Sequence, residues 1–200
     1  MKRQWVTIGI AGLFLAGSAS AKDELPSNVT TKLYGNTKNR VIDKIDYSFS
    51  TAKPVDFARI KLCIAESVTN DEVRLADQAG SFVGSSGTYY RTHNNSTVQG
   101  GDIFKYVDEA SKSLIARGSI RRRGGLGGLL GLAIRYDLEI SASDAGVTMR
   151  MLHLEQAMEN TGSARNDGFM PIGVWAGSMY KKNIVALDQQ AVLIRSCILD

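Results

Sequence analysis

Residues 132–154 carry the pattern that most constrains the fold of this chain. Between residues 132 and 142, apolar and polar side chains alternate with a period of two. Because successive side chains of a β-strand point to opposite faces, this period predicts a strand with one buried face. Residues 143–146 have turn chemistry, and Gly146 is free to adopt a positive φ. The segment therefore predicts a β-hairpin whose second strand begins at Val147.

The side chains of the two arms also predict how the hairpin pairs. If the turn occupies residues 143–146, Ala142 faces Val147. Three further pairs follow from this register: Ile140 with Met149, Leu138 with Met151, and Glu139 with Arg150. Apolar residues then meet apolar residues and a carboxylate meets an arginine, which a shift of one residue would undo. The same register places His153 opposite Tyr136 as a hydrogen-bonded structural residue, and puts Asp137 on the solvent face beside Glu139.

The N-terminus has the features of a secretory signal peptide. Lys2 and Arg3 are followed by an uncharged apolar run over residues 5–16, and Ala19 and Ala21 fit a small-x-small cleavage site. The run is shorter than the roughly 20 residues of a membrane-spanning helix. We therefore expect residues 1–21 to be cleaved and the protein to be soluble in the periplasm or outside the cell.

The mature chain, from Lys22 onward, is long enough to form one domain with a hydrophobic core. It keeps 22 basic and 20 acidic residues, a charge of +2 that gives no argument for a nucleic-acid partner. Residues 22–40 are polar and predict an extended lead-in with at most a short strand at 32–34. Residues 41–200 predict a single α+β domain.

Several further strands are predicted within this domain, over residues 41–49, 73–75, 102–107 and 113–117.

The secondary structure of residues 55–68 is ambiguous. Ala58, Ile60, Leu62 and Ile64 would share one face of a strand, so a strand is favoured, with a helix left open as the alternative.

A helix is predicted for residues 178–198. Its apolar residues recur every three or four positions as one continuous stripe, and Ser178 is a candidate N-cap. The stripe consists of Tyr180, Ile184, Leu187, Ala191, Ile194 and Ile198. We expect this amphipathic helix to cover the sheet face that Tyr136, Leu138 and Ile140 offer. The fold class is therefore α+β, an antiparallel sheet covered by a C-terminal helix.

The two cysteines predict one disulfide, between Cys63 and Cys197. Export brings the chain to an oxidising compartment, and no third cysteine competes for pairing. This prediction conflicts with a strand at residues 55–68, because the sulfur of Cys63 would point away from the face formed by Ile60 and Ile64.

A basic triplet followed by a glycine-rich apolar stretch is the least ordinary segment. It contains Arg121, Arg122, Arg123, Leu126, Leu129 and Leu130. We interpret it as a flexible connector, since glycine-rich segments are usually linkers. The alternative is a loop that touches an anionic membrane surface with its arginines outside and its leucines inside.

Residues 80–101 form a long polar excursion, and such loops often carry function. Tyr89, Tyr90 and His93 lie in it and are candidate ligand contacts, as is Trp175 in the apolar block at residues 169–175. Histidines and cysteines do not fall at zinc-binding spacings, and no nucleophile or metalloprotease motif occurs, so neither a metal nor a cofactor is expected.

These observations favour a non-enzymatic binding protein whose partner is a protein, a glycan or a lipid. The alternatives are a membrane-contacting accessory protein that uses residues 121–131, and a hydrolase whose site is assembled around His93.

Overall fold

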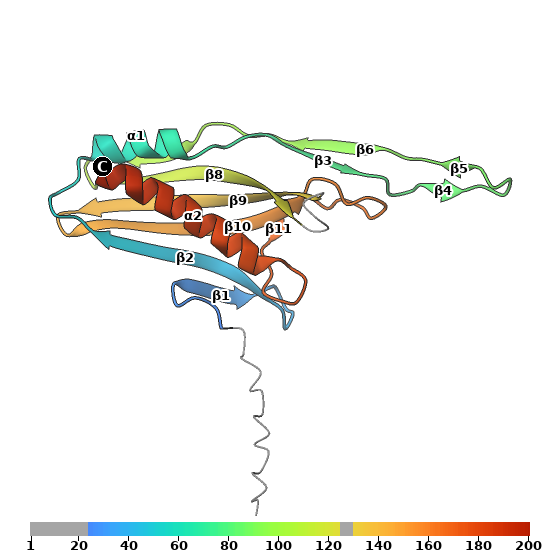
Figure 1. Cartoon of the computed structure of the whole chain (residues 1–200), viewed down its shortest axis with the longest axis horizontal. Helices are drawn as coiled ribbons and strands as arrows, with labels where there is room; N and C mark the ends of the chain where they lie inside the picture. Colours follow the sequence, from blue (N-terminus) through green and yellow to red (C-terminus); the bar gives the residue numbers. More distant parts are fainter. Residues whose placement is uncertain (1–23, 125–129) are drawn as a thin grey trace, which may run out of the picture.

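The computed structural model describes residues 24–124 and 130–200. The predicted signal peptide and the side chains of Leu126, Leu129 and Leu130 lie outside this description. The described ranges form a curved antiparallel sheet, two helices and a long two-stranded arm that projects past one end of the sheet (Figure 1). Neither helix in these ranges is long and apolar enough to cross a membrane.

The main sheet has seven strands in the order β1-β2-β10-β9-β8-β7, with β11 paired to β10. Their bounds are β1 Val29–Leu33, β2 Arg40–Ser50, β7 Phe104–Asp108, β8 Ser113–Gly124, β9 Leu130–Ser143, β10 Gly146–Met158 and β11 Met170–Pro171. All of their pairings are antiparallel. The predicted strands at residues 41–49, 102–107 and 113–117 are thus present, and the lead-in contributes β1 to the sheet.

The predicted hairpin is confirmed as β9 and β10, and its register is confirmed from the turn to Leu152. Ala142 pairs with Val147, Leu138 with Met151, and Glu139 with Arg150. The inward-facing residues of both strands are almost fully buried, while Arg150 and Glu139 lie on the opposite face. Alternating hydrophobicity was therefore sufficient to predict both the pairing and the buried face.

The predicted register fails at His153. The pairing shifts between Leu152 and Glu155, which is a β-bulge, and His153 has a φ of +49°. The extra residue turns the His153 ring away from Tyr136 and onto the exposed face, where its Nδ1 lies 3.0 Å from Asp137 Oδ2. A bulge inserts one extra residue into a strand, so a register that is counted from the turn does not hold beyond it.

Residues 55–68 form a helix and not the favoured strand. Helix α1 spans Phe57–Ser67, and the carboxylate of Asp56 caps it by accepting a hydrogen bond from the backbone N–H of Ala58 (3.0 Å). Phe57, Ile60 and Ile64 are buried, whereas Leu62 is exposed. A helical spacing of three and four residues, with an aspartate before it, was the signal that the period-two interpretation missed.

The C-terminal helix α2, Tyr180–Leu199, lies across one face of the sheet (Figure 1). The predicted stripe is confirmed, since Ile184, Leu187, Ala191 and Ile194 are buried in one core cluster with the inward residues of β9. The predicted N-cap is wrong. Met179 occupies that position, and the one proton of the Ser178 hydroxyl is instead shared between the carbonyl oxygens of Gly173 (2.6 Å) and Trp175 (2.8 Å).

The predicted disulfide between Cys63 and Cys197 is present and joins α1 to the last turn of α2. It resolves the conflict noted in the sequence, because Cys63 lies on the buried side of a helix beside Ile60 and Ile64. Arg59 strengthens the same junction. Its guanidinium donates two hydrogen bonds to the carbonyl oxygen of Cys197, at 3.2 and 2.7 Å, near the carbonyl-rich end of α2.

The arm is built from the predicted excursion and the strand before it. Strand β3, Val73–Asp77, pairs with β6, Asn94–Val98, and farther out β4, Phe82–Val83, pairs with β5, Tyr89–Tyr90. At its root, Val73 and Leu75 pack in a second small core with Ala133 and Ala157 of the main sheet. Beyond this root, the arm extends away from the body (Figure 1).

Candidate functional site

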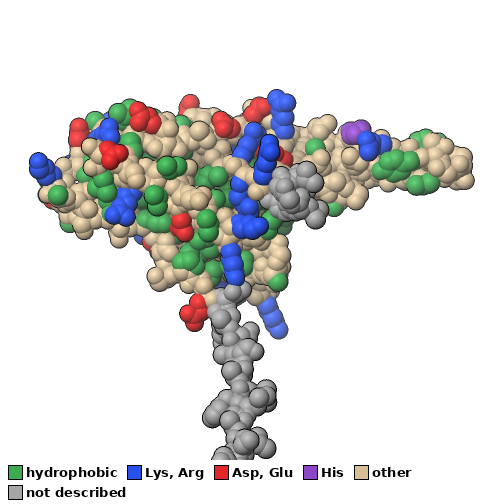
Figure 2. All heavy atoms as spheres, in the orientation of Figure 1, with side chains coloured by type: hydrophobic (Ala, Val, Ile, Leu, Met, Phe, Trp, Pro, Cys, Tyr) green, Lys and Arg blue, Asp and Glu red, His purple; other side chains and the backbone are tan. Residues whose placement is uncertain are grey.

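The outer end of the arm exposes four large apolar side chains. Phe82, Val83, Tyr89 and Tyr90 are 57, 65, 54 and 50% exposed. Figure 2 shows hydrophobic side chains on this narrow projection, away from the body. We call these four residues the aromatic tip. Contiguous apolar surface that supports no core typically marks a contact site.

The strand register divides the aromatic tip into two faces. Phe82 pairs with Tyr90 and Val83 with Tyr89. Because neighbouring side chains in a strand alternate, one pair lies on each face of the ribbon. The rings of Phe82 and Tyr90 are stacked with centroids 4.9 Å apart. The ribbon is therefore apolar on both sides, over a width of only two strands.

A polar turn closes the ribbon beyond the rings. Residues 84–88 are Gly-Ser-Ser-Gly-Thr, and the N–H of Gly84 donates to the carbonyl oxygen of Thr88 (2.8 Å). A Cβ atom on Gly84 would lie 2.8 Å from the Tyr90 ring, so this glycine gives the ring room beside Phe82. The apolar pairs thus lie behind the extreme end of the arm and point sideways.

The outer end of the β3–β6 pair is held by Asp77, which is buried. Its carboxylate accepts hydrogen bonds from the Asn94 side chain (2.6 Å) and from the backbone N–H groups of Ala79 and Asn166 (both 2.9 Å). These bonds, led by that of Asn94, lower the pKa of Asp77. At the root of the arm, the backbone of Gly100 lies against that of Asn70, since a Cβ atom on Gly100 would be 2.1 Å from the carbonyl oxygen of Asn70. The tip is therefore carried by a fixed stem.

Two of the four predicted ligand residues belong to the tip, and two do not. Tyr89 and Tyr90 form β5, while His93 is exposed nearer the body, between β5 and β6. Trp175 is part of a different surface, where its ring packs over Gly173 beside β2. The structure therefore does not combine Trp175 with the tyrosines.

Residues 121–124 are not a loop, because they continue β8. Arg121 forms an ion pair with Glu159 (3.3 Å) and donates to the carbonyl oxygen of Glu72. Arg122 donates twice to Oδ1 of Asn183, a fully buried residue of α2, at 3.0 and 2.7 Å. The interpretation of this triplet as part of a flexible connector is wrong, because two of its arginines bind groups within the fold.

Asp137 is buried and not on a solvated face as predicted. Its carboxylate binds Arg117 (2.8 and 3.2 Å), Lys105 (3.1 Å) and His153 (3.0 Å). Burial alone would raise the pKa of Asp137, but the hydrogen bonds from Arg117 and Lys105 outweigh it and lower the pKa to about 2. These groups come from β7, β8, β9 and β10, so the cluster joins four strands on the face opposite α2.

Sequence reasoning omitted Phe82 and Val83 from the candidate contact residues. A signal was present. A Gly-Ser-Ser-Gly segment between two pairs of large apolar residues is typical of a hairpin, and a hairpin makes the two pairs neighbours. The Asp137 cluster had no comparable signal, because its members are far apart in the chain.

Comparison of the chain with protein-family models, with curated proteins and with solved structures found no match.

Proposed function

We propose that this chain is an exported, non-enzymatic binding protein that inserts the aromatic tip of its arm into a cleft of a protein partner. The observation that carries the proposal is the pair of apolar faces on one narrow ribbon. Phe82 and Tyr90 lie on one side, Val83 and Tyr89 on the other, and all are at least half exposed.

Burial of such side chains in a partner supplies the binding energy. Large aromatic side chains dominate the energetics of protein interfaces, and a rigid support lowers the entropy lost on binding. The bonds to Asp77 at the outer end of β3 and the ring stack at the tip provide this support. A cleft that contacts both sides of the ribbon would bury all four side chains.

A protein cleft fits this geometry better than a membrane surface. Insertion into a bilayer requires apolar side chains at the extreme end, but residues 84–88 at that end are glycine, serine and threonine. Two-sided burial by a cleft leaves this polar turn free to reach solvent or polar groups beyond the apolar contact.

Export is supported by two independent features. The N-terminal sequence has the pattern of a cleaved signal, and the disulfide between Cys63 and Cys197 is of the kind that persists in oxidising compartments.

The test begins with a photo-reactive residue at position 89, which identifies the neighbouring protein in the native envelope. Binding of that purified partner is then measured with the wild type, with Phe82→Ser/Tyr90→Ser, and with Leu33→Ser. Leu33 is 60% exposed on β1 and controls for the loss of an apolar surface elsewhere. We expect the tip variant to bind at least about tenfold more weakly and the control to bind like the wild type.

The melting temperature of the tip variant separates binding from folding. Because the tip lies outside both cores, its melting temperature should match that of the wild type. Unchanged affinity of the tip variant, or loss of affinity only together with thermal stability, would overturn the proposal.

A further inference from the structure

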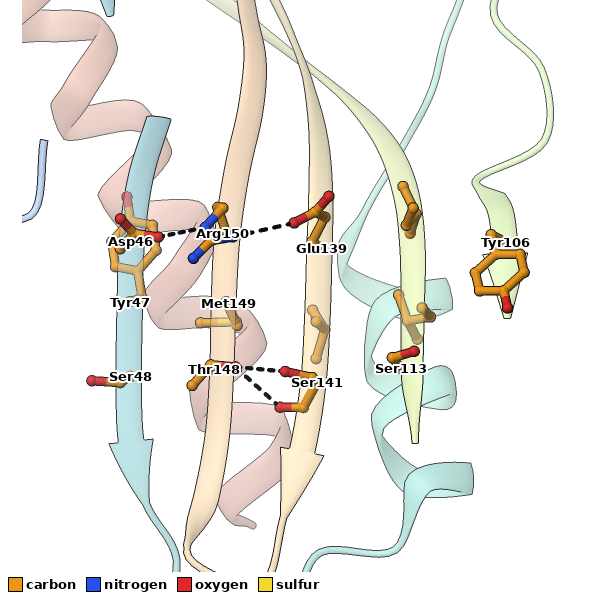
Figure 3. A pocket seen from close by; sticks show the side chains of 13 residues that line it. Asp46, Tyr47, Ser48, Tyr106, Ser113, Glu139, Ser141, Thr148, Met149 and Arg150 are labelled. Atoms are coloured by element: carbon orange, nitrogen blue, oxygen red, sulfur yellow. Dashed lines mark hydrogen bonds and ion pairs between the residues drawn. The ribbon is translucent and has the colours of Figure 1, made fainter. Parts of the chain in front are cut away.

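The sheet face opposite α2 carries a groove that the arm does not use. It has a volume of about 570 Å³ and is lined by side chains from β2, β10, β9, β8 and β7. Figure 3 shows these side chains across neighbouring strands. The volume is in the range of small-ligand sites in proteins.

The register orders one row of hydroxyl groups across this groove. Thr148 pairs with Ser48 on one side and with Ser141 on the other, and Ser141 pairs with Ser113. The hydroxyls of Ser141 and Thr148 lie 2.7 Å apart. With strands ~4.8 Å apart, four strands give a row about 14 Å long.

A second row, two residues along each strand, contains charged and aromatic groups. Arg150 pairs with Asp46 and with Glu139, and the row continues through Ile115 to Tyr106. Arg150 Nε lies 2.7 Å from Asp46 Oδ1, and its Nη1 lies 3.7 Å from Glu139 Oε2. The Tyr106 side chain is half exposed at the end of the groove.

The charges of the lining select against an anionic ligand. Among the described residues that line the groove, Arg150 is the only cation, and the carboxylates of Asp46 and Glu139 hold it. Beside the groove, the ammonium group of Lys44 is likewise held by Asp46, at 2.9 Å. A phosphate or a carboxylate would therefore compete with Asp46 and Glu139 for cations that these carboxylates already bind, while a neutral ligand meets groups that accept and donate hydrogen bonds.

We infer that this groove is a binding site for a neutral, extended oligosaccharide. The row of hydroxyls donates to and accepts from sugar hydroxyls, and the free lone pairs of Asp46 and Glu139 accept further ones. Tyr106 and Ile115 offer apolar surface to the C–H face of a pyranose ring. The sugar chain lies across the strands, along the hydroxyl row, and its rings repeat at nearly the strand spacing.

The inference is tested by nuclear magnetic resonance titration of the mature protein with three probes. Cellotriose and tri-N-acetylchitotriose are neutral and extended, and trigalacturonate is their anionic counterpart. We expect at least one neutral probe to shift the amide signals of residues 113, 141 and 148 in a saturable way. Trigalacturonate should bind at least about tenfold more weakly.

Two groove variants and one control complete the test. Ser141→Ala/Thr148→Val removes two hydroxyls and Tyr106→Ala removes the aromatic surface, so each should weaken binding about tenfold or more. Thr97→Val on the exposed strand β6 of the arm removes a hydroxyl outside the groove and should leave binding unchanged.

Three results would overturn the inference: no saturable shift with either neutral probe, equal or tighter binding of trigalacturonate, or groove variants that bind like the wild type. The variants leave the aromatic tip unchanged, and the titration follows residues of the groove alone. These outcomes therefore leave the proposal for the arm unaffected.

Discussion

Cys63 of α1 and Cys197 of α2 are bonded to each other across 134 residues of sequence, and the bond joins the only two helices of the described ranges. Arg59 binds the carbonyl oxygen of Cys197 at the same junction. The helix that covers the sheet is thus fastened at its C-terminal end by one covalent and two polar contacts.

The disulfide should contribute substantially to stability. Replacing both cysteines with alanine should lower the free energy of unfolding by roughly 2–5 kcal/mol, because a long loop is no longer closed in the unfolded chain. Urea denaturation of the wild type and the variant measures this difference. Two alkylatable thiols in the unreduced mature protein would show that the bond does not form.

The two faces of β9 should respond differently to truncation. Leu138 is fully buried and Glu139 is half-buried on the opposite face, one residue away. Leu138→Ala should cost roughly 2–5 kcal/mol of unfolding free energy, since it leaves a cavity in the core. Glu139→Ala should cost at most about 1 kcal/mol, as expected for an exposed ion pair. Equal tolerance at both positions, measured by urea denaturation, would contradict the assignment of faces.

The Asp137 cluster should make stability depend on pH in the acid range. Because the pKa of Asp137 is about 2 when folded and lies near 4 in an unfolded chain, the carboxylate stabilises the fold above about pH 4. This contribution, roughly 1–2 kcal/mol given that Arg117, Lys105 and His153 are partly exposed, should be lost as the pH falls from about 4 to 2.

Asp137→Asn provides the comparison for this pH dependence. It should be less stable than the wild type by roughly 1–2 kcal/mol at pH 7, and the two proteins should converge near pH 2. Glu139→Gln, on the same face, is the matched control. Parallel stability curves for the wild type and Asp137→Asn would argue against this role.

Replacing Arg122 should destabilise the fold more than replacing its neighbour Arg123. The Arg122 guanidinium binds Asn183, whose Nδ2 in turn donates to Gln156 (2.5 Å), so Arg122→Gln should cost roughly 1–3 kcal/mol. Arg123 is exposed, and Arg123→Gln should change stability by less than about 0.5 kcal/mol. Thermal melts of the two single variants make the comparison, and similar melting temperatures would count against the buried network.

Processing at the N-terminus remains a prediction of the sequence. The mature protein should begin at Lys22, because Ala19 and Ala21 meet the requirements of the cleavage site. N-terminal sequencing of protein from the native cells decides this, and retention of Met1 on a cytoplasmic product would exclude export through this signal.

The sequence by itself determined the features that depend on local periodicity and on composition. Alternation over residues 132–142 was enough for the β9–β10 register from the turn to Leu152, because a slip would expose every buried side chain at once. The stripe from Ile184 to Ile198 was enough for α2 and its buried face. The cysteine count, together with the expectation of export, was enough to predict the Cys63–Cys197 pair.

Only the tertiary structure decided what depends on contacts between distant residues. The apolar run of Phe57–Ser67 fits both periods, and although Asp56 and the spacing of Phe57, Ile60 and Ile64 favour a helix, it is the burial of these residues and the bond to Cys197 that decide between them. The bulge at His153 and the burial of Asp137 depend on four strands meeting in space. The aromatic tip and the hydroxyl row likewise arise from strand pairing, which places side chains from separate segments on one surface.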